Sequence, residues 1–352
     1  MERIRTYAEG LMRDRKNDFL SGMVKTFLWA ISCVYGALVR CHHFFYGIGL
    51  LRSFKASCTV VSVGNITLGG TGKTPLAILI AGRLAKNAKK GEIAVLIRGY
   101  GEDEWKMLKD ELEPEGVSIF VGRDRVKSSG KAVSQGAGTV ILDDGFQHLR
   151  LKRDLDIVLV DSSNPFGNGH IFPRGILRES PSNLKRADII VLTKCGSAKS
   201  DIDAALGKIK SIAPGAAILR ARHMPVGLYA LWKGGKEEAG SLRGKKVCIF
   251  SGISDPSYFR GTVESTGARV ESEFAFPDHY DYKKSDLGRI FSESARLGVD
   301  RIVTTEKDAV KVKAFHDQAW PEVWVLAVEF EIMEGDKALD ACLHRLHMRD
   351  PR

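Results

Sequence analysis

The stretch Gly64–Thr74, which reads GNITLGGTGKT, decides the fold of this chain. It follows an apolar, β-branched run, Cys58–Val63, and leads into Pro75 and a helical pattern. Glycines between a strand and a helix let backbone N–H groups turn towards an anion, and the helix N-terminus adds the positive end of its dipole. This context is typical of a P-loop, which binds the phosphates of a nucleoside triphosphate.

The last residues of this loop have separable roles. Lys73 can reach the β- and γ-phosphates, and the Thr74 hydroxyl can hold Mg²⁺. The usual pattern begins with glycine five positions before the Gly-Lys pair, whereas this chain has Thr67 there. The acids described next therefore carry part of the argument for a nucleotide site. The candidate phosphate cradle consists of Gly69, Gly70, Thr71, Gly72, Lys73 and Thr74.

A second part of the site is predicted at the end of the apolar run Thr139–Leu142. Asp143 and Asp144 follow this run directly. An acid that ends a strand beside a P-loop commonly positions Mg²⁺ opposite the P-loop hydroxyl. Both acids are therefore candidates for the metal side of the site; two acids that merely end a strand are the structural alternative.

Two further groups could serve acid–base chemistry. Asp103 lies in an acidic segment, Glu102–Glu104, after the strand predicted over Ile93–Ile97. A kinase needs a carboxylate, or a histidine tuned by one, to accept the proton of the attacking hydroxyl. His279 lies among acids and aromatic residues in Phe276–Tyr282 and could share a proton with such a carboxylate. Taken alone, the acids also fit a solvated turn and the histidine a structural role.

Arginines could complete the phosphate site, because guanidinium groups bind phosphate through paired hydrogen bonds. Arg123 and Arg125 follow the strand predicted over Val117–Val121, and Arg174 and Arg178 lie in the loop of residues 164–179. Each of them, taken separately, fits an exposed surface arginine equally well.

Composition bounds the class of protein. A length of 352 residues favours two domains. The 53 Lys and Arg exceed the 43 Asp and Glu, which favours a polyanionic partner such as a phosphorylated substrate, an anionic lipid surface or nucleic acid. Nucleic acid has only this net charge in its favour, since no aromatic-basic recognition block is evident. The six cysteines are widely spaced, which is typical of reduced thiols in a cytosolic compartment.

Apolar strands alternate with helical segments along the chain, which predicts an α/β fold with a P-loop NTPase-type, mostly parallel sheet flanked by helices. A second, smaller α/β series begins at Lys246, after a stretch rich in proline and glycine. We expect four parts: an N-terminal helical segment over 1–57, a P-loop domain over 58–222, a connector over 223–242 and a smaller α/β domain over 243–352.

The N-terminal segment contains a charge-free run, Thr26–Val39, between Lys25 and Arg40. Its fourteen residues are fewer than the roughly 18 to 20 that a helix needs to cross a bilayer. Aromatic residues in and after the run, with basic residues around it, suit a helix that lies in a membrane interface. A helix packed into the core is the alternative.

Together these segments resemble the family of tetraacyldisaccharide 4'-kinases, the lipid A 4'-kinases. The matching blocks occur in order along the chain and several are long. They are SVGNITLGGTGKTP (Ser62–Pro75), RGYG (Arg98–Gly101), DE (Asp103, Glu104), VGRDR (Val121–Arg125), ILDDGFQHLRLKRDLDIVLVD (Ile141–Asp161), NPFGNGHIFPRGILRE (Asn164–Glu179), RADIIVLTK (Arg186–Lys194), FPDHYDY (Phe276–Tyr282) and TTEKDAVK (Thr304–Lys311).

This resemblance implies ATP-dependent phosphorylation of the 4'-hydroxyl of a tetraacyldisaccharide 1-phosphate, which gives lipid IV-A. It implies ATP and Mg²⁺ as cofactors, an acylated disaccharide 1-phosphate as lipid substrate, and a place at the cytoplasmic face of the bacterial inner membrane. It also implies a base dyad of Asp103 and His279, and phosphate contacts by Arg125 and Arg178. At the P-loop and the acid pair Asp143–Asp144 it implies the roles given above.

Two other functions remain open at this point. A soluble P-loop kinase of another sugar or small metabolite would need no membrane-facing helix. A P-loop NTPase switch selective for guanine would use an Asn/Thr-Lys-x-Asp element, and the segment Thr193–Gly196 has glycine where the acid should be. The sequence indicates neither a nucleic-acid partner nor an obligate protein partner.

Overall fold

The computed structural model describes Tyr7, residues 10–12, Asp14 and residues 18–99, 102–196, 201–316 and 319–347, without the side chains of 102–104, 106, 107 and 347. The chain forms two compact units. Unit 1 comprises Met1–Cys195, Ser200–Ala221 and Ile332–Arg352, and unit 2 comprises Gly196–Lys199 and Arg222–Glu331. Each is described by itself.

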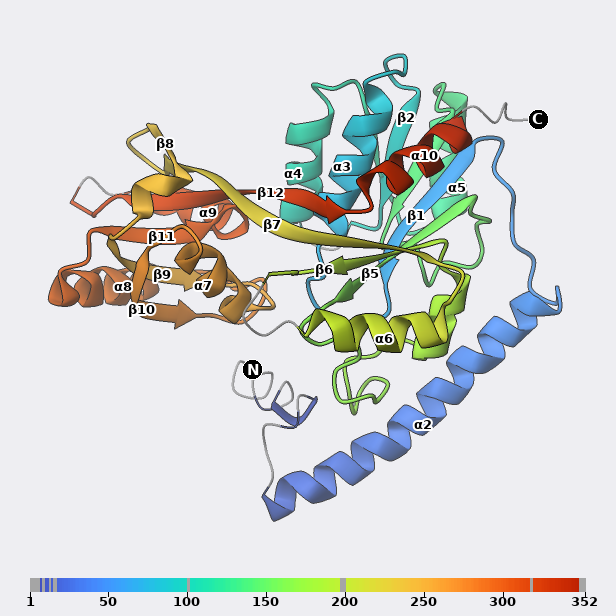
Figure 1. Ribbon diagram of the computed structural model, residues 1–352, viewed down its shortest axis with the longest axis horizontal. Coiled ribbons are helices and arrows are strands. Elements are labelled where there is room, and N and C mark those ends of the chain that lie inside the picture. The colour runs from blue at the N-terminus through green and yellow to red at the C-terminus, as the bar shows by residue number, and fades with distance from the viewer. Residues whose placement is uncertain are drawn as a thin grey trace. The chain divides into compact units, whose positions relative to one another are not determined.

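Unit 1 is built on a parallel sheet with the strand order β6-β5-β1-β4-β2-β3 (Figure 1). Residues Ala217–Arg220 of the long strand β7 (Ala217–Ala230) extend this sheet beside β6. The strands are buried almost throughout, as expected for apolar strands covered on both faces. They are β1 (Thr59–Asn65), β2 (Ile93–Ile97), β3 (Ser118–Val121), β4 (Thr139–Asp143), β5 (Leu155–Asp161) and β6 (Ile189–Thr193).

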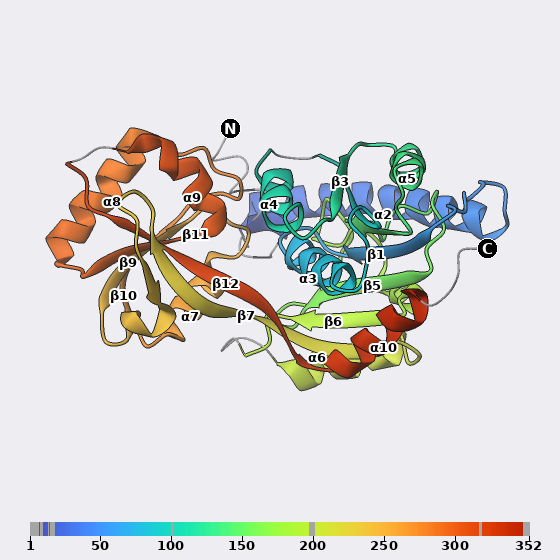
Figure 2. The ribbon, with the colours of Figure 1, turned by 90° about the horizontal axis from the view of Figure 1, so that it is seen from above.

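Helices cover both faces of this sheet (Figures 1 and 2). They are α3 (Lys73–Ala85), α4 (Glu102–Leu112), α5 (Arg125–Ser134), α6 (Ile202–Ile212) and α10 (Asp336–His347), with a 3₁₀ turn η1 (Pro181–Arg186). Strand β1 lies between β4 and β5, so its carboxyl end is next to theirs. In open α/β sheets, ligands bind where neighbouring connections diverge in this way.

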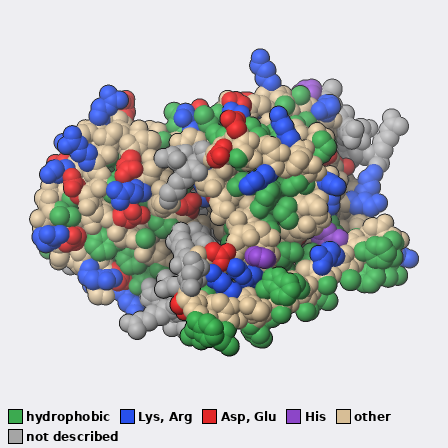
Figure 3. Space-filling model, turned by 60° about the horizontal axis from the view of Figure 1, so that its bottom comes forward, with side chains coloured by type: hydrophobic (Ala, Val, Ile, Leu, Met, Phe, Trp, Pro, Cys, Tyr) green, Lys and Arg blue, Asp and Glu red, His purple; other side chains and the backbone are tan. Residues whose placement is uncertain are grey.

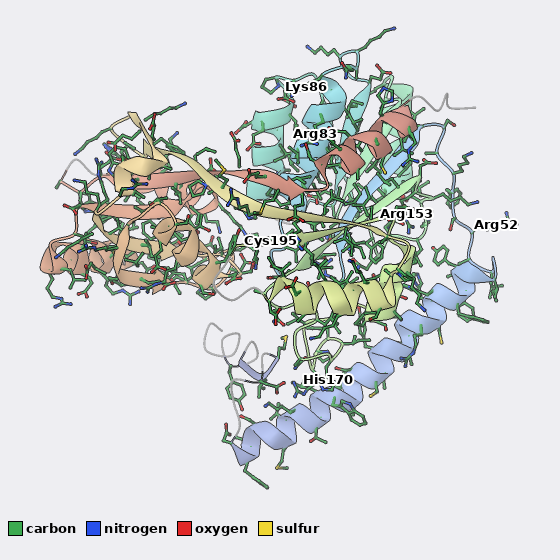
Figure 4. The ribbon with its side chains drawn as sticks, in the orientation of Figure 1. Arg52, Arg83, Lys86, Arg153, His170 and Cys195 are labelled. Carbon is green, nitrogen blue, oxygen red and sulfur yellow. The ribbon has the colours of Figure 1, made fainter. Side chains whose placement is uncertain are left out.

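The C-terminal helix α10 belongs to unit 1, whereas the sequence placed all residues after 243 in the smaller domain. Its leucines Leu339 and Leu343 are buried. Arg83 of α3, labelled in Figure 4, binds Asp336 and Asp340 of α10 at 2.7 and 2.8 Å. Helix α3, which follows the P-loop, is therefore joined to α10 by two ion pairs.

The N-terminal helix α2 (Phe19–Gly47) is 29 residues long, twice the length of the charge-free run, because it continues past Lys25 and Arg40. By length and composition alone this helix could cross a membrane. The prediction that the segment is too short to do so, which counted only the charge-free run, was therefore wrong. Its buried residues are small: Ser21, Ser32 and Gly36.

Most large apolar side chains of α2 are exposed, and Figure 3 shows hydrophobic side chains gathered over it. We call this set the apolar face of α2. It consists of Phe19, Leu20, Met23, Phe27, Trp29, Ile31, Val34, Leu38 and Phe44. The opposite side is docked on unit 1, where Ser32 Oγ donates to the carbonyl oxygen of Ile171 at 2.7 Å.

Unit 2 has a parallel sheet with the order β10-β9-β11-β12, and its part of β7 pairs with β8 in antiparallel fashion. Its core contains Phe250, Leu287, Ile290 and Val325. Its strands are β8 (Lys236–Glu238), β9 (Lys246–Ser251), β10 (Arg269–Ala275), β11 (Arg301–Thr305) and β12 (Val323–Glu334). Its helices are η2 (Ala239–Leu242), α7 (Pro256–Glu264), α8 (Lys284–Leu297), α9 (Glu306–Val312) and η3 (Lys313–Phe315).

The segment expected to be a connector, residues 223–242, forms the second half of β7, β8 and η2. Pro225 and Gly227 lie within the strand, and in a sequence such residues usually mark an interruption. Both β7 and β12 run through the two units, since β7 crosses the boundary after Ala221 and β12 the boundary after Glu331.

Candidate functional site

The P-loop joins the carboxyl end of β1 to the N-terminus of α3. Gly69 and Gly72 have φ angles of 104° and 89°, in the left-handed region that glycine adopts without strain. Asn65 Nδ2 donates to Thr71 Oγ1 at 3.0 Å and ties the loop to the strand that precedes it. The glycine-rich loop thus lies between β1 and α3, where the sequence placed it, and its binding of phosphate stays a prediction.

The loop also pairs with the segment that carries Arg178. Thr67 forms an antiparallel bridge with Leu177, and the Arg178 N–H donates to the Ile66 carbonyl at 2.8 Å. Thr67, which replaces the usual glycine, is thus held in an extended pairing. The same pairing brings Arg178 beside the P-loop.

The candidate metal side of the site pairs Thr74 with Asp143. Thr74 Oγ1 donates to Asp143 Oδ2 at 3.0 Å. The second oxygen, Oδ1, is buried and has no hydrogen-bond partner among the described residues. Burial raises the pKa of Asp143, although Lys73 and Thr74 act in the opposite direction. A buried carboxylate oxygen without a partner next to a P-loop hydroxyl fits a Mg²⁺ ligand, since Mg²⁺ prefers oxygen.

Asp144 has a different environment from its neighbour. Arg178 Nη1 lies 2.7 and 2.9 Å from its two oxygens, and Lys73 Nζ lies 3.7 Å from Oδ1. Burial acts to raise its pKa, but Lys73 and Arg178 together hold the pKa of Asp144 below its usual range. Asp144 is therefore an ionised carboxylate that holds two cations at the edge of the P-loop.

Arg125 lies at the same site, at the start of α5. Its side chain is buried, and Nη2 donates to the Asp143 carbonyl oxygen at 2.7 Å. Its Nη1 group is buried without a partner among the described residues, and burial lowers the pKa of Arg125 to about 10. A buried guanidinium with one donor to spare is suited to an anionic ligand.

The other two candidate arginines lie elsewhere. Arg123 is exposed. Arg174 binds Asp14 at 2.7 Å and the Leu11 carbonyl oxygen, so it serves the docking of the N-terminal segment. The residues taken separately gave the four arginines equal weight, and the family resemblance singled out Arg125 and Arg178.

Sequence reasoning missed Gln147 and Glu179. Gln147 Nε2 donates to the Asn65 carbonyl oxygen and to Glu179 Oε1, both at 2.7 Å, and Gln147 Oε1 accepts from Arg178 at 3.3 Å. The Glu179 side chain is fully buried. Its other partners are Asn183, Arg186 and, at 3.4 Å, His43 of α2. These two residues lie inside the quoted blocks, but nothing local indicates that they form one buried network.

The members of the predicted base dyad fall in different units. Asp103 lies in the first turn of α4, not in a loop, and its side chain is outside the described part. His279 belongs to unit 2, where its backbone N–H donates to the Gly252 carbonyl oxygen at 3.1 Å. The dyad therefore stays a prediction.

Within the described residues, no group of three or more His, Cys, Asp and Glu side chains could hold a metal ion by itself. Thr74 and Asp143 are the candidate protein ligands, and Mg²⁺ usually takes its remaining ligands from phosphate oxygens and water. The arrangement can thus hold a triphosphate, its metal and a compensating set of cations.

Comparisons with known proteins point in one direction. The family model described as Tetraacyldisaccharide-1-P 4'-kinase matches residues 24–347. A relative named Tetraacyldisaccharide 4'-kinase from Anaeromyxobacter dehalogenans is 39% identical over 325 residues, 85% of this chain and 84% of the relative. A protein of the same name from Syntrophus aciditrophicus is 38% identical over 334 residues, 87% of this chain and 88% of the relative.

A solved structure has the same fold. The crystal structure of LpxK from Aquifex aeolicus in complex with ATP superposes with a TM-score of 0.66 at 24% identity, and the match covers 92% of this chain and 99% of that one. The α/β fold predicted from the sequence is thereby confirmed.

Proposed function

The chain belongs to the tetraacyldisaccharide-1-phosphate 4'-kinase family, and from this premise we propose which of its residues carry out the reaction. It is a tetraacyldisaccharide 4'-kinase (EC 2.7.1.130) of lipid A biosynthesis. The other kinase substrates and the NTPase switch that the sequence left open are set aside by this membership.

The donor is ATP, held by the P-loop. The observation that carries this proposal is the Thr74–Asp143 pair at the start of α3, with a buried Asp143 oxygen that lacks a partner. Thr74 and Asp143 would hold Mg²⁺, which neutralises charge on the phosphates when it is bound. The N–H groups of the Gly69–Gly72 segment face the phosphates.

Lys73, Arg125 and Arg178 bind the developing negative charge. Asp144 keeps Lys73 and Arg178 close together before ATP enters, so the protein supplies cations whose positions are already set. Such preorganised charge accounts for most of the catalytic effect in phosphoryl transfer, which needs in-line positioning and little covalent chemistry.

The 4'-hydroxyl of the acylated disaccharide 1-phosphate is the nucleophile. Its oxygen forms a bond to the γ-phosphorus while the bond from that phosphorus to the bridging oxygen of ADP breaks. The carboxylate of Asp103 takes the hydroxyl proton, and His279 assists it. Placing ATP chemistry and a lipid acceptor together requires a membrane surface on the side where ATP is made, the cytoplasmic face.

The apolar face of α2 meets that surface. We place α2 in the interface and not across the bilayer, because its opposite side is fixed to unit 1 through Ser32 and the Ile171 carbonyl oxygen. A helix docked along its length on a water-soluble body lies parallel to the membrane plane.

The test uses the purified full-length chain in detergent with Mg-ATP and tetraacyldisaccharide 1-phosphate. Mass spectrometry should detect one added phosphoryl group, located on the non-reducing sugar. Lys73→Met is the matched control, since it keeps an unbranched side chain of similar size without the charge, and it should give no product. Absence of product from well-folded wild-type protein, or equal phosphorylation of water-soluble sugars, would contradict the proposal.

A further inference from the structure

A lysine lies against the imidazole of His279, and the proposed mechanism does not use it. Lys307 is in the first turn of α9. Its Nζ lies 3.2 Å from His279 Nε2 and 2.9 Å from Asp278 Oδ1. The carboxylate of Asp278 therefore anchors the ammonium group in its contact with the ring.

The chemistry of the two groups fixes the proton on the ring. A lysine ammonium has three donors and no acceptor. The contact at 3.2 Å is a hydrogen bond only when His279 Nε2 presents a lone pair. A neutral ring with its lone pair on Nε2 carries its proton on Nδ1.

The backbone holds the ring in place. His279 has a φ angle of 59°, which is rare for a residue other than glycine. The next residue, Tyr280, stacks on Phe276 with ring centroids 4.7 Å apart, and its carbonyl oxygen accepts from Lys311 Nζ at 3.1 Å. A conformation this unusual, fixed from several sides, is characteristic of functional positions.

Other charged groups of unit 2 near this loop are engaged elsewhere. Lys311 binds the Tyr280 carbonyl oxygen, and Asp308 accepts from Gly252 N–H and from Thr305. Lys307 of α9 and Asp278 of the same loop both contact the ring, at 3.2 and 3.9 Å from His279 Nε2.

We propose that Lys307 is a positioning residue that holds His279 neutral, with its proton on Nδ1. This rests on the proposed function, in which His279 assists the carboxylate of Asp103. An imidazole whose Nε2 is occupied by a cation is a poor proton acceptor. The carboxylate therefore takes the hydroxyl proton, and the ring presents an N–H donor at Nδ1.

The first measurement is the ¹⁵N spectrum of the histidine rings in the full-length protein, with His279 assigned through His279→Gln. We expect the wild type to show the Nδ1–H form near neutral pH. A wild-type ring with its proton on Nε2 would overturn the proposal, whatever the variants do.

The second measurement uses Lys307→Met, which keeps an unbranched side chain of similar size and removes the charge and the donors. We expect the ring to shift towards the Nε2–H form and its pKa to rise. The acid limb of the kcat–pH profile should move to higher pH, and kcat near neutral pH should fall about tenfold with the KM for ATP unchanged. Lys307→Arg, which retains donors, should restore most of kcat.

Lys311→Met is the matched control, because it removes a lysine from the same helix whose Nζ donates to the backbone carbonyl oxygen of Tyr280. It should leave the tautomer unchanged. A purely structural Lys307 would lower the rate equally at all pH values and leave the spectrum as it is. Failure of the proposed function is separate: the protein would then show the Nδ1–H ring but no lipid phosphorylation.

Discussion

Asp143 and Asp144 are adjacent in the chain, but their surroundings give them opposite electrostatic properties. Burial raises the pKa of Asp143, whereas Lys73 and Arg178 outweigh burial at Asp144 and lower its pKa. The positive φ of Asp144, 57°, separates the directions of the two side chains. A metal ion would thus stabilise the charge of Asp143, whereas the charge of Asp144 is already balanced by Lys73 and Arg178.

Asp143→Asn should therefore weaken the metal site more than the protein fold. We expect the Mg²⁺ concentration for half-maximal rate to rise by about tenfold or more, the scale on which changes around metal ligands act. Magnesium titrations of the kinase rate would measure this, with Asp110→Asn, an exposed acid of α4, as the control. An unchanged magnesium dependence would remove Asp143 from the metal site.

Asp103→Ala and His279→Ala test the base dyad. Each should lower turnover by about 100-fold, the typical contribution of a general base, with little change in ATP affinity. Single-turnover rates and ATP titrations separate the two quantities. Near-normal turnover in either variant would exclude that residue from proton transfer.

Gly64 illustrates a close approach that only glycine allows. A Cβ atom there would lie 2.5 Å from Phe146 Cβ and 2.7 Å from the Phe146 nitrogen. Gly64→Ala should cost about 1 to 3 kcal/mol in the free energy of unfolding, the usual scale of overpacking. Gly207→Ala, in the exposed interior of α6 with open space around it, should instead be neutral or stabilising. Equal stabilities of the two variants in denaturant titrations would contradict this account.

Among single residues, the sequence predicts those that belong to a contiguous motif or that end a recognisable strand. The P-loop is contiguous, and Asp143 ends β4, the neighbour of β1, so the structure places both at the sheet edge that the sequence predicts, while their roles stay predictions. Gln147 and Glu179 were missed because their importance arises from burial and from partners far along the chain. No local pattern encodes such a network.

Among the elements, α2 differs most from the rest of the molecule. A narrow stripe of small residues is docked, while its large side chains are exposed. Large apolar residues usually face a core, so an exposed set of this size indicates that the apolar face of α2 contacts an apolar surface.

Replacing two side chains of the apolar face of α2, in Phe27→Ser with Leu38→Ser, should weaken binding to vesicles that contain anionic lipid. Each buried side chain of this size is worth about 1.5 to 3 kcal/mol, so the double variant should lose at least tenfold in partition coefficient. Sedimentation with vesicles measures it. Cys41→Ser, an exposed change on the same helix, is the control; equal binding of both would contradict an interfacial role.

The regular elements were predictable to within a few residues because parallel strands are apolar throughout and helices are periodic. Strand β2 has the predicted bounds, and β4 extends its prediction by one residue. Strand β7 was not predicted, because Pro225 and Gly227 interrupt the apolar pattern and many of its side chains are only partly buried.

At the scale of the whole molecule, stability should fall in mild acid. Burial, and then Arg125, Arg153 and Arg150, lower the pKa of His148 from 6.5 to about 4, and Arg153 is labelled in Figure 4. The unfolded chain binds a proton at His148 below about pH 6.5, but the folded chain does not until about pH 4. The contribution of His148 to the free energy of unfolding is thus fully present above about pH 6.5, and it is lost as the pH falls towards 4.

His148→Gln removes this contribution to the acid sensitivity. Denaturant titrations between pH 6.5 and pH 4 should give a shallower decline for the variant than for the wild type. Parallel curves would show that His148 is protonated to the same extent in both states.

Unit 1 is discontinuous in the gene: its last helix is encoded after the whole of unit 2. Unit 2 is therefore translated completely before Asp336 and Asp340 can form their ion pairs with Arg83. Deletion of α10 would remove both carboxylates that bind Arg83, so an isolated unit 1 has to retain α10 and omit the inserted unit 2.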